Sequence, residues 1–447
     1  MGWAVVIFLL IQSFFLIPQG GLEGFAAVPK LGSRVSVPRE LLTLWAIYAL
    51  IGYVVIRGTV RKPPKCLFFG LFLVWVAIQV IYPTSYYFKQ VFFYINPFGL
   101  KIFHYILFFS LGWWMLSGVL TRRDVRIIGT GLVGIGLIHS ILVIAQWAGH
   151  PPILWLPAKW IPVDPKHVVG FVGNTWHLAA YLAFIVPLAL DRFRSTWANL
   201  IVYLLLGLAL YYTKSTAAVI AAVVGVLVYG GRELFRGWAA FAMVALIITV
   251  PAYIIAVDRP GQFDWDRYYI WKTTLKMVAP PGFRTEIQMV KRDERFLPPA
   301  TAFAIGYGPS GYQRVFPAMS GRVNGNVYFN YQGSGSAFIH SDGRRQDLTK
   351  TAGYARPTPT LHAHNEPLQV LFEHGLIGLL LVAGTVWWFV RRTSHYLFLA
   401  EDSEVRRLVG VLSAIGTHSL LFQTFHVAQL ATVAVVGAAG LFVLTEM

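Results

Sequence analysis

Charged residues are scarce in this sequence, and cysteine is almost absent. Only 13% of the 447 residues are charged and 56% are hydrophobic, whereas charged residues make up about a quarter of a soluble globular domain. This composition excludes an ordinary soluble protein and predicts a polytopic membrane protein. The single cysteine, Cys66, excludes an internal disulfide and a metal centre built from several thiolates.

Acidic residues are the rarer charge type, with 20 Asp and Glu against 37 Lys and Arg. In a soluble protein the resulting net charge of +17 would indicate a nucleic-acid partner. Here the basic residues lie between apolar runs, where they orient helices and meet anionic lipid headgroups. We therefore expect membrane lipids as partners and no nucleic acid.

The apolar runs predict an all-α fold of about twelve transmembrane helices, because roughly 20 apolar residues cross a bilayer. The first run has no basic residue before Lys30, which favours a membrane helix over a signal peptide. The expected spans are 2–18, 41–57, 66–82, 101–120, 126–147, 175–190, 197–212, 214–230, 237–256, 367–390, 406–426 and 428–445.

The spans divide the chain into three parts: helices 1–9 in residues 1–256, a large loop in 257–364, and helices 10–12 in 365–447. Alternate short loops hold 15 Lys and Arg and the intervening ones hold eight. This excess predicts that both termini are cytoplasmic and that the large loop lies on the outer side. The 15 basic residues lie in 57–65, 122–126, 192–194, 232–236 and 391–407.

The large loop is the one soluble module that the sequence predicts, and outer loops of this length are usually functional. Its stretch FDWDRYYIWKTTLKMV, 263–278, has apolar residues at helical spacing. A later stretch, VNGNVYFNYQGSGSAFIHSDGRR at 323–345, alternates apolar residues around glycines and predicts a hairpin.

The stretch HAHNEPLQVLFEHGLIG, 362–378, places many polar groups at the start of an apolar run. Pro367 suits the first turn of a helix, so we expect a helix from here to about residue 390, beginning at the outer membrane surface. Its N-terminal dipole and free amides would then favour an anion such as a diphosphate.

Two polar residues of this helix share one face, Gln369 and Glu373, because they are four positions apart. At 1.5 Å per residue, Glu373 would lie about 10 Å deeper than Glu366. A carboxylate at that depth is costly and indicates a functional site. The alternative is a structural ion pair with an arginine that holds helices together.

His364 is the candidate general base, since histidine accepts a proton near neutral pH and this one lies just outside the bilayer. The alternative is a histidine that only caps the helix or sits at the lipid interface. Asn365 and His362 are supporting candidates, His362 being the weaker histidine. His374 points off the face of Gln369 and Glu373, so we interpret it as a packing or interface residue.

These residues carry a resemblance to the O-antigen ligase and Wzy-type O-antigen polymerase superfamily of bacterial membrane glycosyltransferases. HNEPLQVLFEHGLIG resembles the family signature of His, a small polar residue, nine residues, Gly, two residues and Gly. Three further stretches are similar to family motifs: GNTWHLAAYLAFIVPLAL at 173–190, RYYIW at 267–271 and GYGPSGYQRVFP at 306–317. Together they cover roughly residues 170–390.

The resemblance implies a GT-C-like fold in the bacterial inner membrane with a periplasmic active site. Members of the family transfer a glycan from undecaprenyl diphosphate to an acceptor hydroxyl, without metal or cofactor. By this resemblance His364 activates the acceptor, Arg267 binds the diphosphate and Arg314 is a second clamp. Arginine suits that role because its planar fork binds phosphate oxygens in pairs. The alternative for both arginines is contact with lipid headgroups or a carboxylate.

The chain departs from the family pattern at 213–218, which reads TKSTAA. Many members have an arginine where this chain has Thr216, and that arginine is thought to bind phosphate. Lys214 can supply a positive charge there, but not the bidentate geometry of arginine.

The carboxylates of Asp264 and Asp266 form a pair of the kind that some glycosyltransferases use to bind a divalent ion. Such an ion needs more oxygen ligands than these two residues supply, so we expect no metal.

The predicted function is therefore an O-antigen ligase that uses lipid A core as the acceptor in lipopolysaccharide biosynthesis. A polymerase, whose acceptor is a growing glycan, and a protein-glycosylating oligosaccharyltransferase share the signature and stay open. The rival class is a polysaccharide or lipid transporter, for which the sequence lacks the expected paired repeats.

Overall fold

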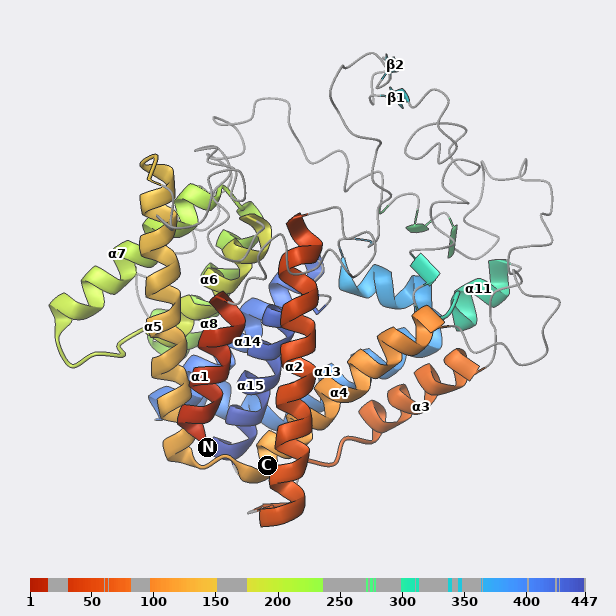
Figure 1. Cartoon of the computed structure of the whole chain (residues 1–447), viewed down its shortest axis with the longest axis horizontal. Helices are drawn as coiled ribbons and strands as arrows, with labels where there is room; N and C mark the ends of the chain where they lie inside the picture. The colour runs from red at the N-terminus through yellow and green to blue at the C-terminus, as the bar shows by residue number, and fades with distance from the viewer. Residues whose placement is uncertain are drawn as a thin grey trace. The chain divides into compact units, whose positions relative to one another are not determined.

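Figure 1 shows a computed structural model of the whole chain. By contacts the chain divides into two compact units. Unit 1 comprises Met1–Lys65, Phe108–Gly261 and Phe389–Met447, and unit 2 comprises Cys66–Leu107 and Gln262–Trp388. The structure describes residues 1–14, 31–59, 61–62, 64–81, 97–150, 175–235, 271, 274–275, 277–278, 299–309, 311–312, 337–339, 345–347, 363, 365–399, 402–422, 424–425 and 427–445.

The described residues are those of an α-helical membrane protein. Each predicted helix that falls among them is present, whereas the expected span 237–256 lies outside them. The helices are α1 (Gly2–Phe14), α2 (Leu31–Arg57), α3 (Leu67–Ile81), α4 (Pro97–Val119), α5 (Arg122–Trp147), α6 (Thr175–Ala189), α7 (Thr196–Thr213), α8 (Thr216–Phe235), α11 (Pro299–Ile305), α13 (Glu366–Leu399), α14 (Ser403–Leu421) and α15 (Ala428–Thr445).

Four helical stretches are long and apolar enough to cross a membrane: Ile102–Val119, Arg122–Trp147, Thr196–Thr213 and Glu366–Thr393. Six shorter apolar helical stretches accompany them among the described residues, at Gly2–Ser13, Leu41–Arg57, Leu67–Val80, Thr175–Ala189, Thr216–Gly230 and Gln429–Thr445. The total of twelve spans stays a prediction.

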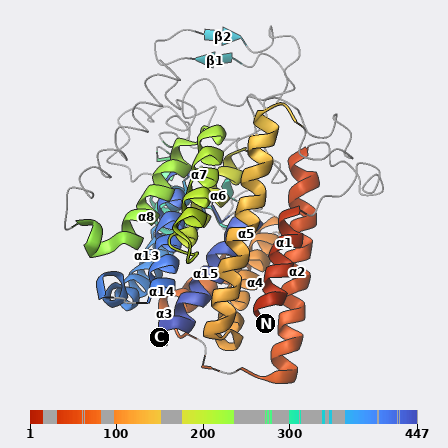
Figure 2. The same ribbon diagram turned by 90° about the vertical axis from the view of Figure 1, so that its left-hand side faces the viewer.

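Unit 1 is a helical bundle in which α6 is the central helix (Figures 1 and 2). Helix α6 packs on α5, α7, α8 and α14, while α5 also packs on α1 and α14 on α15. Every residue from Leu178 to Ile185 of α6 is buried. A helix that is apolar on all sides, as this one is, is expected to be enclosed by other helices.

Small residues let the helices of unit 1 approach closely. A Cβ atom on Gly225 of α8 would lie 2.5 Å from the Cγ of Pro187 in α6 and 2.8 Å from the carbonyl oxygen of Gly410 in α14. Small residues at helix contacts are typical of membrane bundles, where close van der Waals packing replaces the hydrophobic driving force. Helices α8 and α14 therefore meet at their backbones, and the side chain of Pro187 in α6 packs against both glycines.

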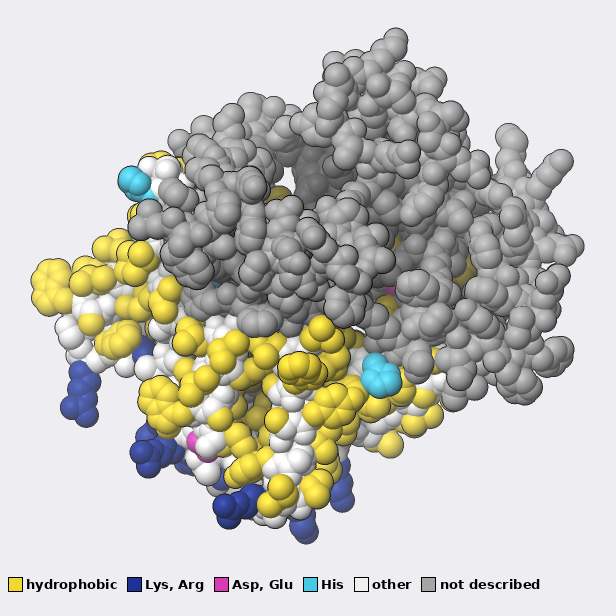
Figure 3. Space-filling model, viewed as in Figure 1, with side chains coloured by type: hydrophobic (Ala, Val, Ile, Leu, Met, Phe, Trp, Pro, Cys, Tyr) yellow, Lys and Arg dark blue, Asp and Glu magenta, His cyan; other side chains and the backbone are white. Residues whose placement is uncertain are grey.

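The described surface is largely apolar on the face that Figure 3 shows, with most of the visible Lys and Arg gathered along one edge. Large hydrophobic side chains are exposed on several helices of unit 1, among them Trp3, Ile7, Trp45, Ile138 and Trp197. Contiguous exposed apolar surface of this kind marks contact with a membrane or a partner.

A buried ion cluster holds the turn between α6 and α7 to α14. Arg192 donates from Nη1 to both carboxylate oxygens of Glu404, at 2.7 and 2.6 Å, and Arg407 lies 3.2 Å from the same carboxylate. Burial lowers the pKa of Arg192, and the Glu404 carboxylate opposes that shift. The sequence assigned both arginines to helix orientation and lipid headgroups; it did not predict the ion pair of Arg192 with Glu404, which is distant from it in the sequence.

Unit 2 contains α3, the first part of α4, α11 and the first part of α13, together with a pair of short strands. Strand β1 (Ala337–Ile339) pairs antiparallel with β2 (Arg345–Asp347), with Phe338 opposite Gln346. Strand β1 lies within the stretch 323–345 for which the sequence predicted a hairpin, and β2 begins at its last residue, so the antiparallel pair extends beyond the predicted bounds.

Helix α13 is not the continuous helix that the sequence predicted. Gly375 has φ 67° and ψ −171°, a conformation outside the helical region, so α13 consists of two helical segments that meet at this residue. Glu366 and Glu373 both lie on the first segment. The helical rise between them therefore says nothing about the position of residues after Gly375. The prediction of an uninterrupted helix was wrong. A glycine in an apolar run is compatible with a helix and with a break, so the sequence does not predict its φ angle.

Candidate functional site

The candidate site of unit 2 is built around the first segment of α13, which begins where the sequence predicted. The side-chain oxygen of Asn365 accepts a hydrogen bond from the backbone N–H of Leu368 at 2.9 Å, and its carbonyl oxygen accepts from the N–H of Gln369 at 2.9 Å. This is the arrangement of an N-cap residue. Asn365 therefore fixes the start of the helix directly after His364 in the sequence.

Three carbonyl groups of α13 beside the break at Gly375 accept hydrogen bonds from other elements. The N–H of Tyr307 donates to the carbonyl oxygen of Phe372 at 2.9 Å, and that of Gly308 donates to Glu373 at 2.7 Å. The indole Nε1 of Trp75, in α3, donates to the carbonyl oxygen of His374 at 3.0 Å. The end of the first helical segment is thus capped by the loop after α11 and by α3.

The loop after α11 approaches this break closely through glycines. Gly306 has φ 74°, and a Cβ atom on it would overlap the carbonyl of Glu373 and reach 2.5 Å from the nitrogen of Gly375. A Cβ on Gly375 would overlap the carbonyl of Ala304. A Cβ on Gly378 would overlap the Cβ of His374. The close contacts at Gly375 and Gly378, the two glycines of the sequence signature, therefore leave no room for a side chain.

Gln369 and Glu373 lie on one face, as predicted, and bind each other. Nε2 of Gln369 donates to Oε1 of Glu373 at 2.9 Å, and both residues are only 3% exposed. The Oε1 of Glu373 also accepts from the backbone N–H of Tyr312 at 3.2 Å. On its other side, Gln369 accepts a hydrogen bond from the N–H of Ala363 at 2.7 Å.

Two further bonds close these contacts into a ring. Nε1 of Trp271 donates to the carbonyl oxygen of Ala363 at 2.9 Å. Three positions further along the sequence, the hydroxyl of Thr274 lies 3.0 Å from that of Tyr312. Burial raises the pKa of the Tyr312 phenol well above its ordinary value, the hydroxyl of Thr274 opposes that shift and the charge of Glu373 adds to it. Tyr312 therefore stays protonated and available as a hydrogen-bond donor.

We call this set the polar ring: Trp271, Thr274, Tyr312, Ala363, Gln369 and Glu373. It joins the three stretches of unit 2 that carry the sequence resemblance. Trp271 belongs to RYYIW, Tyr312 to GYGPSGYQRVFP, and Gln369 and Glu373 to HNEPLQVLFEHGLIG. Trp271 and Tyr312 lie in motifs and Thr274 lies outside them, and the sequence predicted no role for any of the three.

His374 is a packing residue, one of the two roles that the sequence predicted for it. It is 4% exposed, its Nδ1 lies 2.6 Å from Oε1 of Gln79, and its ring packs edge-on against Phe72 at 5.4 Å. Gln79 also donates to the carbonyl oxygen of Ile305 and was missed by the sequence reasoning. The available signal was its polarity, because it is the one strongly polar side chain in the apolar run of α3.

Lys214 lies in unit 1, at the turn between α7 and α8. It is exposed, adopts the left-handed conformation with φ 52° and ψ 26°, and donates its N–H to the carbonyl oxygen of Tyr211 at 3.1 Å. Ser215 is buried beside it and accepts a bond from the N–H of Ala218. The side chain of Lys214 is thus presented to the exterior of unit 1 at the C-terminus of α7.

Several predicted residues lie outside the described part of the chain: Arg267, Arg314, His362, His364, Asp264 and Asp266. Their roles stay predictions. Of the candidates that are described in unit 2, the structure brings Asn365, Gln369 and Glu373 together on the first segment of α13. Among the described residues, no three His, Cys, Asp or Glu side chains are grouped to hold a metal ion.

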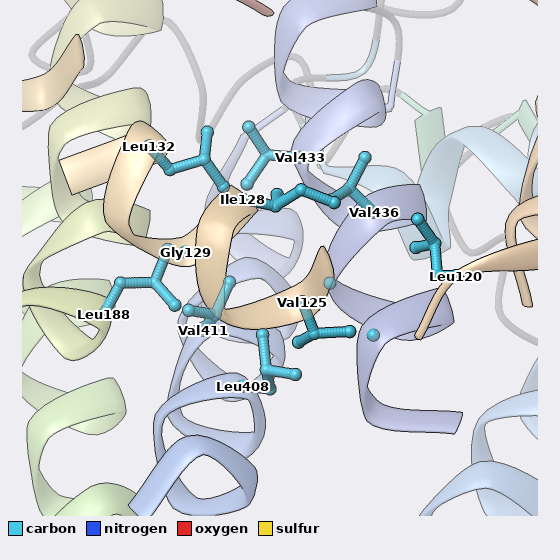
Figure 4. A pocket seen from close by; sticks show the side chains of 12 residues that line it. Leu120, Val125, Ile128, Gly129, Leu132, Leu188, Leu408, Val411, Val433 and Val436 are labelled. Atoms are coloured by element: carbon cyan, nitrogen blue, oxygen red, sulfur yellow. The ribbon is translucent and has the colours of Figure 1, made fainter. Parts of the chain in front are cut away.

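An apolar cavity of unit 1 contributes nothing to this site (Figure 4). It lies between α5, α6, α14 and α15, and its lining consists only of aliphatic side chains and glycines, such as Ile128, Leu132, Val411, Val433 and Gly437. Such a lining offers no group that could bind an anion or transfer a proton. We interpret it as a packing gap left by small residues at a helix crossing.

Comparison with models of known protein families finds no match to this chain, and comparison with curated proteins finds no match either.

Proposed function

We propose that the protein is a membrane glycosyltransferase of the bacterial inner membrane that transfers a glycan from undecaprenyl diphosphate to an acceptor hydroxyl. Its most favoured form is an O-antigen ligase with lipid A core as the acceptor. In this proposal the chain has about twelve spans in a GT-C-like arrangement, both termini are cytoplasmic, and the reaction takes place at the periplasmic face.

One observation carries the proposal. Three stretches that resemble family motifs are far apart in the sequence, and in unit 2 they are joined by the hydrogen bonds of the polar ring. Chance similarities would have no reason to meet in this way. The cap by Asn365 adds support, because it starts a helix directly after His364, where a dipole favours a bound anion.

The proposed reaction needs a base at the acceptor and positive charge at the leaving group. The acceptor hydroxyl oxygen forms a bond to C1 of the reducing-end sugar, and His364 takes the hydroxyl proton. The bond between C1 and the phosphate oxygen breaks, and the undecaprenyl diphosphate leaves with the electron pair. Arg267 and Arg314 are proposed to bind that diphosphate through their guanidinium groups.

The test is transfer by the purified protein in detergent, supplied with undecaprenyl-diphosphate glycan and lipid A core. We expect a glycan–lipid A product from the wild type and loss of product from His364→Ala, since the base is gone. His150→Ala, at an exposed position after the end of α5, is the control and should retain most of the rate. No product from the wild type with any acceptor would reject a glycosyltransferase and favour a transporter.

A polymerase is the second candidate, because the chain has Thr216 where many ligases have an arginine. A polymerase would use a non-extended glycan repeat on undecaprenyl diphosphate as the acceptor, in place of lipid A core. Offering the two acceptors at equal concentration to one preparation separates the candidates by product. A peptide acceptor in a third reaction examines protein glycosylation in the same way.

A further inference from the structure

The residue that immediately precedes His364 is held through both its backbone N–H and its carbonyl group. The N–H of Ala363 donates to Oε1 of Gln369 at 2.7 Å, and its carbonyl oxygen accepts from Nε1 of Trp271 at 2.9 Å. Ala363 itself is 0% exposed. Buried hydrogen bonds such as these are strong because no water competes for them.

The residue that immediately follows His364 is held as well. Asn365 accepts hydrogen bonds from the N–H groups of Leu368 and Gln369. The chain is therefore anchored to the first segment of α13 on both sides of position 364. Gln369 takes part in both anchors, with its side chain at Ala363 and its backbone at Asn365.

The orientation of the Gln369 amide is set by its two neighbours. Its oxygen meets an N–H donor, that of Ala363, while its nitrogen meets the Oε1 acceptor of Glu373. A flipped amide would place two donors together on one side and two acceptors on the other. Glu373 receives a second donor, the N–H of Tyr312, at the same oxygen. The ring thus uses Glu373 as an acceptor.

We propose that the polar ring is a positioning frame for His364, and that Gln369, Trp271 and Glu373 are its positioning residues. This inference rests on the proposed function, because it takes His364 as the residue that accepts the proton. In this frame Glu373 acts as a hydrogen-bond acceptor at Oε1. It does not exchange a proton with the substrate.

The frame predicts different outcomes for variants of similar size. Gln369→Met keeps the length of the side chain but removes both of its hydrogen bonds. We expect its kcat to fall on the order of 100-fold, as for a small misplacement of a reacting group, with the donor KM changed less than about twofold. Glu373→Gln keeps an acceptor oxygen and should retain a rate near that of the wild type.

The frame also has a readout that does not depend on the reaction. Hydrogen–deuterium exchange of the full-length protein in detergent, followed in a peptide that contains Ala363, should be faster in Gln369→Met than in the wild type. Thermal unfolding shows whether each variant is folded. Where Gln369→Met does not fold, Trp271→Phe replaces it, because it loses the single bond to Ala363 and keeps an aromatic ring.

The outcomes separate the two proposals. A wild type that transfers no glycan rejects the proposed function, and the exchange result then still decides whether the ring holds Ala363. An active wild type with an inactive His364→Ala and a fully active Gln369→Met would overturn the frame. So would a Glu373→Gln variant as inactive as His364→Ala, because it would make Glu373 a proton-transfer residue.

Discussion

At the scale of single residues, Lys214 combines an unusual backbone with an exposed charge. A non-glycine residue in the left-handed conformation costs about 1 kcal/mol, and Asp191 and Lys214 are the non-glycine examples among the described residues. Asp191 is compensated by hydrogen bonds from the hydroxyls of Tyr203 and Tyr229. At Lys214 the backbone conformation ends α7 and exposes the side chain, where the sequence predicts a phosphate-binding cation.

Replacing Lys214 tests that charge. We expect Lys214→Ala to raise the donor concentration for half-maximal rate about fivefold, which corresponds to roughly 1 kcal/mol for an exposed point charge. The measurement is initial transfer rate against donor concentration at fixed ionic strength. Lys214→Arg preserves the charge and should behave as the wild type. An unchanged donor dependence in Lys214→Ala would remove Lys214 from the donor site.

At the scale of elements, the decisive feature is the meeting of α11 and α13. The loop after α11 donates N–H groups to carbonyl oxygens of α13 beside its break, and the two backbones touch at Gly306 and Gly375. The same loop continues to Tyr312, whose N–H reaches Glu373. The glycine contact therefore sets the distance at which the polar ring can close.

A methyl group at Gly375 should open this contact. The conformation of Gly375 is nearly exclusive to glycine, and a Cβ would overlap the carbonyl of Ala304. We expect Gly375→Ala to lower the free energy of unfolding by roughly 2–4 kcal/mol, measured by the midpoint of thermal unfolding in detergent. The matched control is Gly207→Ala in α7, where a Cβ meets nothing within 4 Å. Equal midpoints for the two variants would contradict this account.

At the scale of the whole molecule, the orientation in the membrane is the property that the distribution of charge predicts. Exposed basic residues such as Arg57, Lys62, Arg122, Arg123 and Arg194 lie at loops that the sequence assigns to the cytoplasm. Helix α7 is long and apolar enough to span, with Arg194 before its start and Lys214 after its end. Both of these side chains are exposed, so a labelling reagent can test which side of the membrane each end of α7 faces.

Cysteine labelling can read this orientation, because the chain has one native cysteine to remove. In a Cys66→Ser background, Lys214→Cys should react with a membrane-impermeant maleimide in intact spheroplasts. Arg194→Cys should react only after the membrane is permeabilised. The reverse pattern would invert the predicted topology, and external labelling of both sites would show that α7 does not cross the membrane.

Much of the fold could be predicted from the sequence because it depends on neighbours in the chain. Runs of apolar residues predicted the helices, including α7 and α8, which are separated only by Lys214 and Ser215. The shared face of Gln369 and Glu373 followed from helical spacing, and the start of the helix near Pro367 followed from the residue types at a helix start. Each of these features is decided within a few residues by backbone geometry and by transfer of apolar groups out of water.

The tertiary structure alone decided the features that need a distant partner. The break at Gly375 depends on Ala304 and Gly306, which approach it from another helix. The role of Glu373 as an acceptor depends on the N–H of Tyr312, and the burial of Arg192 on Glu404. The sequence shows which groups are able to form hydrogen bonds and ion pairs. These interactions act over about 3 Å, so only the packed chain determines which of those groups meet.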